Sequence, residues 1–344
     1  MPNSVVGLDI GHGVLRAAEI VNQVRKPMVA RYFEMPVPME AVNRGEVVDR
    51  DMVRRALRLM WSRARFKTKD VVLGMGNQRV LSRDYLVPEA PLDRIREALP
   101  FQVQDLLPVP VADALLDFYP VSREMGEQGP MIHGLLIAAV KDAVLGNVET
   151  VESAGLHVAE VDLIPFALTR LLGGSGVSAL VDIGASTTNV AISVAGVPRF
   201  VRVLPSGSRD ISDAIVARHG IAFEDADRIK QQVGVVSMVV TPEQRPVIDT
   251  IHQATGELLS GVRNTIAYFV SNHPELPVSE IVLSGGGSQM AGIREALSEL
   301  VRIPVRDADP FQRVAAARSL ASDSLRAARS KAPVAIGLAL GSAA

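Results

Sequence analysis

The sequence predicts a mixed α/β protein built from two similar domains, and three observations support this. The motif Asp-Ile-Gly ends a short apolar run at residues 9–11 and again at residues 182–184, about half the chain away. Each motif is followed by a tight turn and further apolar, β-rich stretches. The chain has 344 residues, of which 48% are hydrophobic and 22% charged, as is typical of a globular protein with about two domains.

The first half opens with three strands and a helix. Apolar stretches at 5–11 and 14–21 enclose a tight turn, and a third strand is expected at 28–35. Asp51 is expected to be the N-cap of a helix whose apolar residues recur at helical spacing as far as Ala64.

The second half repeats this order. The strands and the helix that follows them are expected at 178–184, 189–194, 198–204 and 208–219. Strands at 71–75 and 281–284, each reached through helices, are expected to add in parallel to the two sheets.

Two segments interrupt the repeat. An inserted subdomain is expected to contain a strand at 115–121 and a polar loop at 122–130, and a late connector is expected to contain a helix at 312–328. The predicted organisation is a first domain at 1–77, an inserted subdomain at 78–160, a connecting helix and hinge at 161–176, a second domain at 177–333 and a C-terminal segment at 334–344.

Composition excludes several classes of function. The net charge of −2 gives no overall basic surface for nucleic acid. The chain has no cysteine, which excludes disulfides and thiolate chemistry, and its 6 histidines show no metal-ligand spacing. No apolar run has the length of a membrane span, and the N-terminal residues do not resemble an export signal. We therefore expect a cytoplasmic protein that reaches a membrane only through a partner.

The two Asp-Ile-Gly turns are candidates for holding a polyphosphate. Gly11 and Gly13 permit positive φ and leave backbone amides open to a phosphate. Asp9 would repel a phosphate, so its position is best explained by a hydrated Mg²⁺ that contacts the phosphates. The turn after Asp182 adds hydroxyls and amides, so two such turns would grip a polyphosphate from both sides.

A third glycine-rich stretch, at residues 285–287, follows a predicted strand and leads into a helix expected at 293–301. Backbone can approach a ligand closely at such a place. Taken alone, the stretch is equally explained as a flexible turn.

With three such turns in this order, the chain resembles the actin–Hsp70–sugar kinase superfamily of nucleotide binders. Within it, the sequence is similar to the PilM family of type IV pilus assembly proteins, which is related to the cell-division protein FtsA. Further stretches that carry this resemblance lie at 97–110, 116–119, 207–211, 223–230, 309–311 and 335–340. The implied fold is an actin/Hsp70-like (RNase H-like) pair of duplicated domains around a nucleotide cleft, with a small inserted α+β subdomain.

The resemblance implies ATP and Mg²⁺ in this cleft, with the metal held through water by Asp9 and Asp182. The residues that it places near the phosphates are Gly11, His12, Gly13, Arg16, Gly184, Ser186 and Thr187. Those that it places near the ribose and the base are Asp227, Lys230, Gly285, Gly286, Gly287 and Met290. Without the family, Lys230 is better explained as a solvated helix charge and Met290 as a core residue.

The first turn departs from the family pattern. Relatives usually have Asp-Ile-Gly-Ser-Ser-x-x-Lys, whereas this chain has His12 and Gly13 at the serine positions and Arg16 at the lysine position. His12 either contacts a phosphate or faces solvent. Arg16 either binds phosphate in a bidentate manner or forms a cross-strand ion pair with Glu19.

The hydrolytic residue also departs from the pattern. ATPases of this superfamily place an acid or an amide near the start of the helix that joins the halves, where it orients the attacking water. Ile164 fills that position, and the nearest acid, Asp162, is the candidate catalytic residue, although its default role is a helix N-cap. We therefore expect ATP binding with weak or no ATPase activity.

The resemblance implies a cytoplasmic scaffold, peripheral to the inner membrane, without direct membrane insertion and without nucleic acid as a partner. PilM-like proteins dock the cytoplasmic N-terminal tail of an inner-membrane protein, usually PilN, and link it to the pilus assembly motor. The docking groove is expected beside the inserted subdomain, near residues 99–119.

Two alternatives remain open at this point. An FtsA-like cell-division adaptor usually ends in a basic amphipathic helix, which residues 336–344 do not resemble. A small-molecule kinase of the same superfamily requires an acid positioned as a base between the turns, and the sequence offers no obvious candidate.

Overall fold

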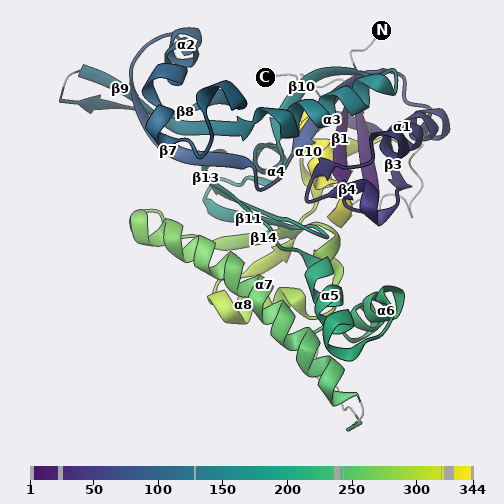
Figure 1. The fold of residues 1–344 in the computed structure, drawn as a ribbon. Coiled ribbons are helices and arrows are strands. Elements are labelled where there is room, and N and C mark those ends of the chain that lie inside the picture. The colour runs from purple at the N-terminus through teal and green to yellow at the C-terminus, as the bar shows by residue number, and fades with distance from the viewer. Residues whose placement is uncertain are drawn as a thin grey trace.

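Two twisted sheets with matching strand orders form the centres of the two halves (Figure 1). The computed structural model describes residues 4–21, 26–127, 129–235, 241–242, 244–318, 320 and 329–341. The strands of the first sheet are β1 (Ser4–Gly11), β2 (Val14–Val21), β3 (Met28–Pro36), β6 (Asp70–Met75), β10 (His157–Leu163) and β16 (Ala315–Ala316). Those of the second sheet are β11 (Val177–Ile183), β12 (Thr188–Val194), β13 (Val197–Leu204), β14 (Glu280–Ser284) and β15 (Val305–Asp307).

The two sheets have the same topology over five strands, and β16 is an additional strand at the edge of the first sheet. The first has the order β10-β6-β1-β2-β3-β16 and the second has the order β13-β12-β11-β14-β15. In both, an antiparallel three-strand meander is extended by parallel strands, β6 beside β1 and β14 beside β11. The predicted repeat and the predicted parallel additions are therefore confirmed.

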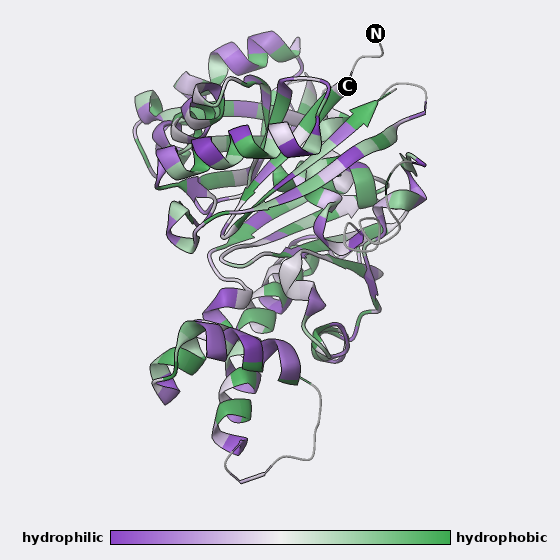
Figure 2. Cartoon of the chain, turned by 90° about the vertical axis from the view of Figure 1, so that its right-hand side faces the viewer, coloured by the Kyte–Doolittle hydropathy of each residue, from purple (hydrophilic) through white to green (hydrophobic). Residues whose placement is uncertain are grey.

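Helices cover both faces of each sheet. The helices are α1 (Arg50–Ala64), α2 (Leu92–Gln102), α3 (Lys141–Ser153), α4 (Ile164–Leu172), α5 (Ser208–His219), α6 (Phe223–Val233), α7 (Arg245–Asn272), α8 (Ile293–Val301) and α10 (Pro333–Gly341). Figure 2 shows hydrophobic residues along the strands between the layers and alternating hydrophilic and hydrophobic residues on the outer helices.

The C-terminal helix α10 and the connecting helix α4 lie between the two sheets, in one core that draws residues from both halves. Two glycines allow this close approach. A Cβ on Gly7 of β1 would lie 2.0 Å from the carbonyl oxygen of Ala335, and one on Gly337 would lie 2.2 Å from that of Ala167. The apolar C-terminal segment is thus an internal packing element that links the two halves.

A third sheet with the order β7-β9-β8 forms the inserted subdomain and projects from the first half (Figure 1). Its strands are β7 (Val80–Pro88), β8 (Ala114–Gly126) and β9 (Gly129–Val140), and α2 packs on β8 over a small apolar core. After it, α3 packs against α1, and β10 returns to the first sheet beside β6. A short hairpin of β4 (Val42–Asn43) and β5 (Glu46–Val47) completes the strands of the described residues.

Several element boundaries differ from the predicted ones. The N-cap of α1 is Asp49, whose side chain accepts from the amide of Met52 at 2.9 Å, and Asp51 lies in the first turn. Residues 122–126 and 129–130, predicted as part of a loop, belong to strands β8 and β9, which form a hairpin. A polar composition therefore does not distinguish an exposed hairpin from a loop.

Two predicted helical stretches also differ. The chain is in strand β10 as far as Leu163, so the connecting helix begins at Ile164. In the stretch 312–328, residue 312 ends a 3₁₀ turn (Pro310–Gln312), and residues 315–316 form β16 beside β3. Residues 319 and 321–328 lie outside the described residues.

Candidate functional site

Asp9 and Asp182 occupy equivalent places near the ends of β1 and β11, and both are only 8% exposed. Ser284 Oγ donates to Asp182 Oδ1 at 2.9 Å. Burial, together with the negative charge of Asp9, raises the pKa of Asp182 to about 6. Burial also raises the pKa of Asp9, against the lowering effect of Arg16. Two carboxylates that disfavour each other's charge in a buried place form a natural site for a cation.

Arg16 forms an ion pair with Asp9, and its positive charge also lowers the pKa of Asp182. Its Nη1 lies 3.5 Å from Asp9 Oδ2, and its Nε lies 3.9 Å from Glu34 Oε2. The cross-strand pair predicted with Glu19 is wrong, since Glu19 is fully buried and its Oε2 pairs with Arg31 Nη1 at 2.5 Å. Arg16 also reaches toward the second half, where a Cβ on Gly286 would lie 3.8 Å from its Nη2.

The second turn is fixed to the start of helix α5. The amide of Ser208 donates to the carbonyl oxygen of Gly184 at 3.0 Å, and the amide of Arg209 donates to that of Ala185 at 2.8 Å. Gly207 allows this contact, because a Cβ there would lie 2.4 Å from the oxygen of Ala185. The second turn and α5 therefore form one rigid unit.

The third turn lies on the end of β11. Gly285 has a φ of +91°, and a Cβ there would lie 2.3 Å from the carbonyl oxygen of Ile183. Gly287 is buried against the same isoleucine, and Met290 is buried in the core of the second half. Of the third-turn candidates, only Gly285 and Gly286 line the cleft.

The cleft between the turns has a volume of about 110 Å³. The predicted residues that line it are Asp9, Gly11, His12, Arg16, Asp182, Gly184, Ser186, Thr187, Gly285 and Gly286. Gly13, with a φ of +78°, is in the same turn as Gly11 and His12. The three glycine turns, which are far apart in the sequence, thus meet in one place.

Other lining residues were not predicted as site residues. They include Gly76, Asn189, Ser208 and Lys331. Asn189 Oδ1 is buried without a hydrogen-bond partner in the part of the chain that the structure describes, and a Cβ on Gly76 would lie 2.8 Å from it. Asn189 directly follows the second turn, which was a usable signal. Lys331 is far from the turns in the sequence and belongs to no motif, so only the fold shows that it lines the cleft.

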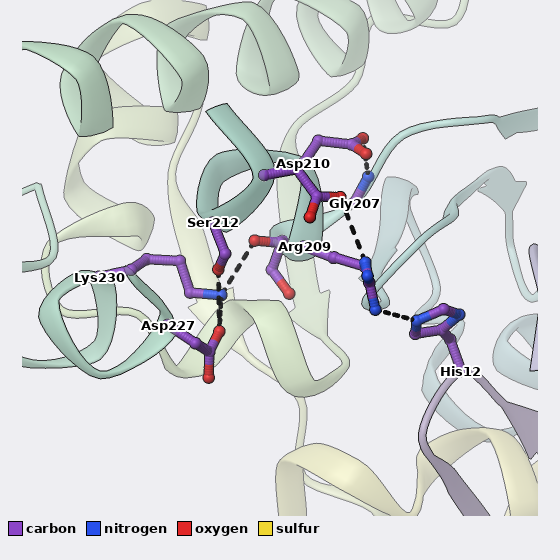
Figure 3. Close-up of polar contacts among 9 residues, drawn as sticks. His12, Gly207, Arg209, Asp210, Ser212, Asp227 and Lys230 are labelled. Carbon is purple, nitrogen blue, oxygen red and sulfur yellow. Dashed lines mark hydrogen bonds and ion pairs between the residues drawn. The ribbon is translucent and has the colours of Figure 1, made fainter. Parts of the chain in front are cut away.

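His12 of the first turn contacts Arg209 of α5 in the second half (Figure 3). Burial and the positive charge of Arg209 lower the pKa of His12, so the imidazole is neutral near pH 7. His12 lines the cleft and contacts a side chain of the opposite half, so it does not simply face solvent, and its contact with a phosphate stays a prediction.

Lys230 of α6 is buried and pairs with Asp227 of the same helix, which is half-buried (Figure 3). Lys230 Nζ donates to Asp227 Oδ1 at 2.6 Å and to the carbonyl oxygen of Ser208 at 3.0 Å. Burial alone would raise the pKa of Asp227, but the hydrogen bond and charge of Lys230 lower it. The pair does not line the described cleft, and it supports the first turn of α5 from behind.

Asp162 is held in an ion pair away from the cleft. Arg170 Nη2 lies 2.5 Å from Asp162 Oδ2, and the amide of Leu163 donates to Oδ1 at 2.8 Å. The N-cap residue of α4 is Leu163, so the N-cap role expected for Asp162 is wrong. Ile164, and not Asp162, lines the cleft at the start of this helix.

Groups of three or more metal-ligating side chains are absent from the described residues. The two aspartates therefore offer a cation only part of a coordination shell, as expected for a metal held largely through water and ligand oxygens. In the described part of the chain, no helix has the length and apolar character of a membrane span.

Comparisons with known proteins agree with this architecture. Residues 7–343 match the family model described as "Type IV pilus assembly protein PilM". The solved structure described as "PilM-PilN type IV pilus biogenesis complex" has a TM-score of 0.84 and 25% identity and covers 98% of both chains. The cell division protein FtsA of Bacillus subtilis (strain 168) is 22% identical over 319 residues, covering 80% of this chain and 72% of that protein.

A more distant solved structure has the same fold. MreB5 of Spiroplasma citri, described as bound to ADP, has a TM-score of 0.51 and 13% identity and covers 97% of this chain and 94% of that one. At this identity the likeness shows the fold alone. The predicted actin-like fold is confirmed.

Proposed function

Because the chain belongs to the family of type IV pilus assembly protein PilM, we propose that it binds ATP and Mg²⁺ between its halves and acts as a scaffold of pilus assembly. In this proposal the protein is cytoplasmic and peripheral to the inner membrane. It docks the cytoplasmic N-terminal tail of a PilN-like inner-membrane protein and links it to the assembly motor. The proposal that the protein binds a nucleotide rests on one observation. Two buried aspartates, Asp9 and Asp182, line the same cleft as the three glycine turns.

The residues present fit a magnesium nucleotide. The carboxylates of Asp9 and Asp182 are buried in the cleft near Arg16, which pairs with Asp9, and the orphaned Oδ1 of Asn189 offers a further acceptor. Gly11, Gly184 and Gly286 keep the backbone bare where phosphates would approach. Asp9 and Asp182 would hold the cation, and Arg16 and the hydroxyls of Ser186 and Thr187 would contact the phosphates. When bound, Mg²⁺ would neutralise charge on the phosphates.

We also propose that binding exceeds turnover. Ile164 has no group that orients an attacking water, and Asp162 is engaged by Arg170. The expected result of a single-turnover ATPase assay is slow hydrolysis or none. Rates of about 1 s⁻¹ or faster, which are typical of committed enzymes, would contradict this.

Nucleotide binding is tested by titrating a fluorescent ATP analogue with and without Mg²⁺. We expect Asp182→Asn to weaken Mg²⁺-dependent binding by at least about tenfold, since each lost charge-assisted contact costs roughly 1.5–3 kcal/mol. The matched control is Asp142→Asn, an exposed acid on α3, which should bind as the native protein does. Equal affinity in the presence of EDTA would refute the metal-dependent site.

The partner proposal rests on the similarity to a PilM–PilN complex over nearly the whole chain. In the stretch near residues 99–119, expected to form the docking groove, Phe101 is 79% exposed and Leu115 is 38% exposed. Exposed apolar side chains are available to serve as anchors for a bound segment. We therefore place the tail-binding surface on this side of the inserted subdomain.

The test is binding of a labelled synthetic peptide with the sequence of the PilN tail encoded in the same genome. Phe101→Glu should weaken binding by about tenfold or more if this residue is an anchor. The control is Met125→Glu, because Met125 is 80% exposed on the same subdomain but lies outside the stretch. Equal loss in both variants, or in neither, would remove the stretch near residues 99–119 as the docking site.

The similarity to FtsA supports a second candidate function, that of a cell-division adaptor. Purifying the tagged protein from its own cells in mild detergent, with and without Mg-ATP, separates the two. Co-purifying pilus proteins of the inner membrane would support the scaffold, and co-purifying division proteins would support the adaptor.

A further inference from the structure

A groove of about 590 Å³ runs between the inserted subdomain and the second half of the molecule. Its two sides are β7 and β13, each at the edge of its sheet, and the two strands lie side by side (Figure 1). Among the described residues, β7 pairs only with β9, and β13 pairs only with β12. Both strands therefore present unpaired backbone groups to the groove.

The groove is lined by basic side chains that are free to bind. Arg83 of β7 and Arg202 of β13 are exposed, and neither has an ion pair or side-chain hydrogen bond with any described residue. The acid in the lining, Asp84, lies 3.6 Å from His133 and 3.9 Å from His273. In addition, Ser82 Oγ is buried without a partner in the described part of the chain. The two arginines outnumber the single acid of the lining, so the net formal charge of the groove is positive.

One side of the groove is aromatic. Tyr268 of α7 is 56% exposed, and its ring centre lies 5.8 Å from that of Phe200 on β13. Exposed aromatic rings of this kind supply contact area at a low cost in conformational entropy, and they are enriched in binding surfaces.

We propose that this groove binds an extended, acidic segment of a partner protein, which adds a strand alongside β7 or β13. Backbone pairing to an exposed edge gives affinity, and the side chains beside the edge give specificity. Arg83 and Arg202 select acidic residues, and Phe200 with Tyr268 accept an apolar or aromatic one. The site is separate from the stretch near residues 99–119, and its occupant would contact the inserted subdomain and the second half at once.

The probe is a labelled synthetic peptide in which glutamate alternates with valine or phenylalanine, compared with the same peptide carrying lysine in place of glutamate. We expect the acidic peptide alone to bind, and amide hydrogen exchange to slow in residues 80–84 and 200–203. Arg83→Glu combined with Arg202→Glu should weaken binding by at least about tenfold, because like charges then face the peptide. The control is Arg55→Glu combined with Arg63→Glu, two exposed arginines on α1.

Several results would contradict this proposal. Equal binding of both peptides, protection elsewhere, or full binding by the groove variant would overturn the proposal. The groove variant should also retain the PilN-like tail, whereas Phe101→Glu should retain the acidic peptide. If the groove variant no longer binds the PilN-like tail, this groove is the tail-binding site, and the proposal of a second, separate site is wrong.

Discussion

Arg209 Nη1 lies 2.7 Å from His12 Nε2, so a side chain of the second half contacts the first turn of the first half across the cleft. Arginine can only donate, so His12 Nε2 accepts, and the proton of the neutral imidazole is on Nδ1. Arg209 is itself held by Asp213 at 3.2 Å and by the ring of Phe223, 4.6 Å from the guanidinium carbon. The contact therefore joins the first turn to the rigid unit of α5 and the second turn.

The first prediction is that Arg209→Ala loosens this closure. A hydrogen bond of this kind contributes roughly 1 kcal/mol, so amide exchange in residues 11–14 of the nucleotide-free protein should be about fivefold faster. The measurement is hydrogen exchange followed by mass spectrometry.

Arg218→Ala is the matched control for this change. Arg218 lies on the same helix and donates to Gln253 Oε1 at 3.1 Å, on the side away from the cleft. Its removal should leave exchange in residues 11–14 unchanged. If both variants exchange like the native protein, the contact does not hold the halves together.

The second prediction concerns pH and Asp182. Its pKa is about 6 in the folded protein against 3.8 as an ordinary carboxyl, so the folded state binds the proton more tightly than the unfolded chain does. Stability from this group is then full below about pH 4 and is lost as pH rises through about 6.

Asp182→Asn should remove this loss. Without Mg²⁺ at about pH 7.5 the variant should melt about 2–4 °C above the native protein, and the gap should close as pH falls toward about 4. Differential scanning calorimetry in EDTA measures this. The exposed Asp142→Asn should show no such gap, and a gap independent of pH would rule out titration of Asp182 as its cause.

The third prediction is that Arg16→Met makes the protein depend on Mg²⁺ for stability. Asp9 would then lose its ion-pair partner and lie near Asp182 without the positive charge of Arg16, at a cost of about 1–3 kcal/mol. Millimolar MgCl₂ should restore part of the lost melting temperature, because the carboxylates are left free for the metal.

Arg31→Met provides the comparison. It also strips a buried carboxylate, Glu19, of its arginine partner, but that carboxylate does not line the cleft. The variant should be destabilised without recovery in MgCl₂. Equal recovery of both variants would mean that Mg²⁺ acts on the protein in general and not at the aspartates.

The fold and the ends of the two aspartate strands could be predicted because both depend on local patterns. Apolar runs that end in Asp-Ile-Gly mark buried strands that stop at a turn, and their repetition marks the duplication. The ion-pair partner of Arg16 could also have been predicted from the sequence. The two-residue turn after Gly11 fixes the register of the β1–β2 hairpin, which sets Asp9 opposite Arg16.

Other features depend on tertiary contacts that leave no local trace. Lys331 lines the cleft because α10 lies between the two sheets, and nothing near it in the sequence indicates that position. Lys230 and Met290 occupy family positions, yet the first is buried against Asp227 and the second lies in the core. A motif fixes where the backbone runs, whereas neighbours from other elements decide which side chains reach the cleft.

The last prediction compares two glycines. Gly285→Ala should destabilise the protein by at least about 2 kcal/mol, because the position combines strained backbone with a collision and leaves no room for relaxation. Its φ is +91°, and the new Cβ would lie 2.3 Å from the backbone oxygen of Ile183. Gly256→Ala should instead stabilise it by about 0.5–1 kcal/mol, since this exposed position inside α7 has nothing within 4 Å of the new Cβ. Urea denaturation measures the free energy of unfolding of each variant, and the two changes relative to the native protein are expected to have opposite signs. A Gly285→Ala variant as stable as Gly256→Ala would mean that the third turn does not rest on β11, and the backbone would then not form the third wall of the cleft.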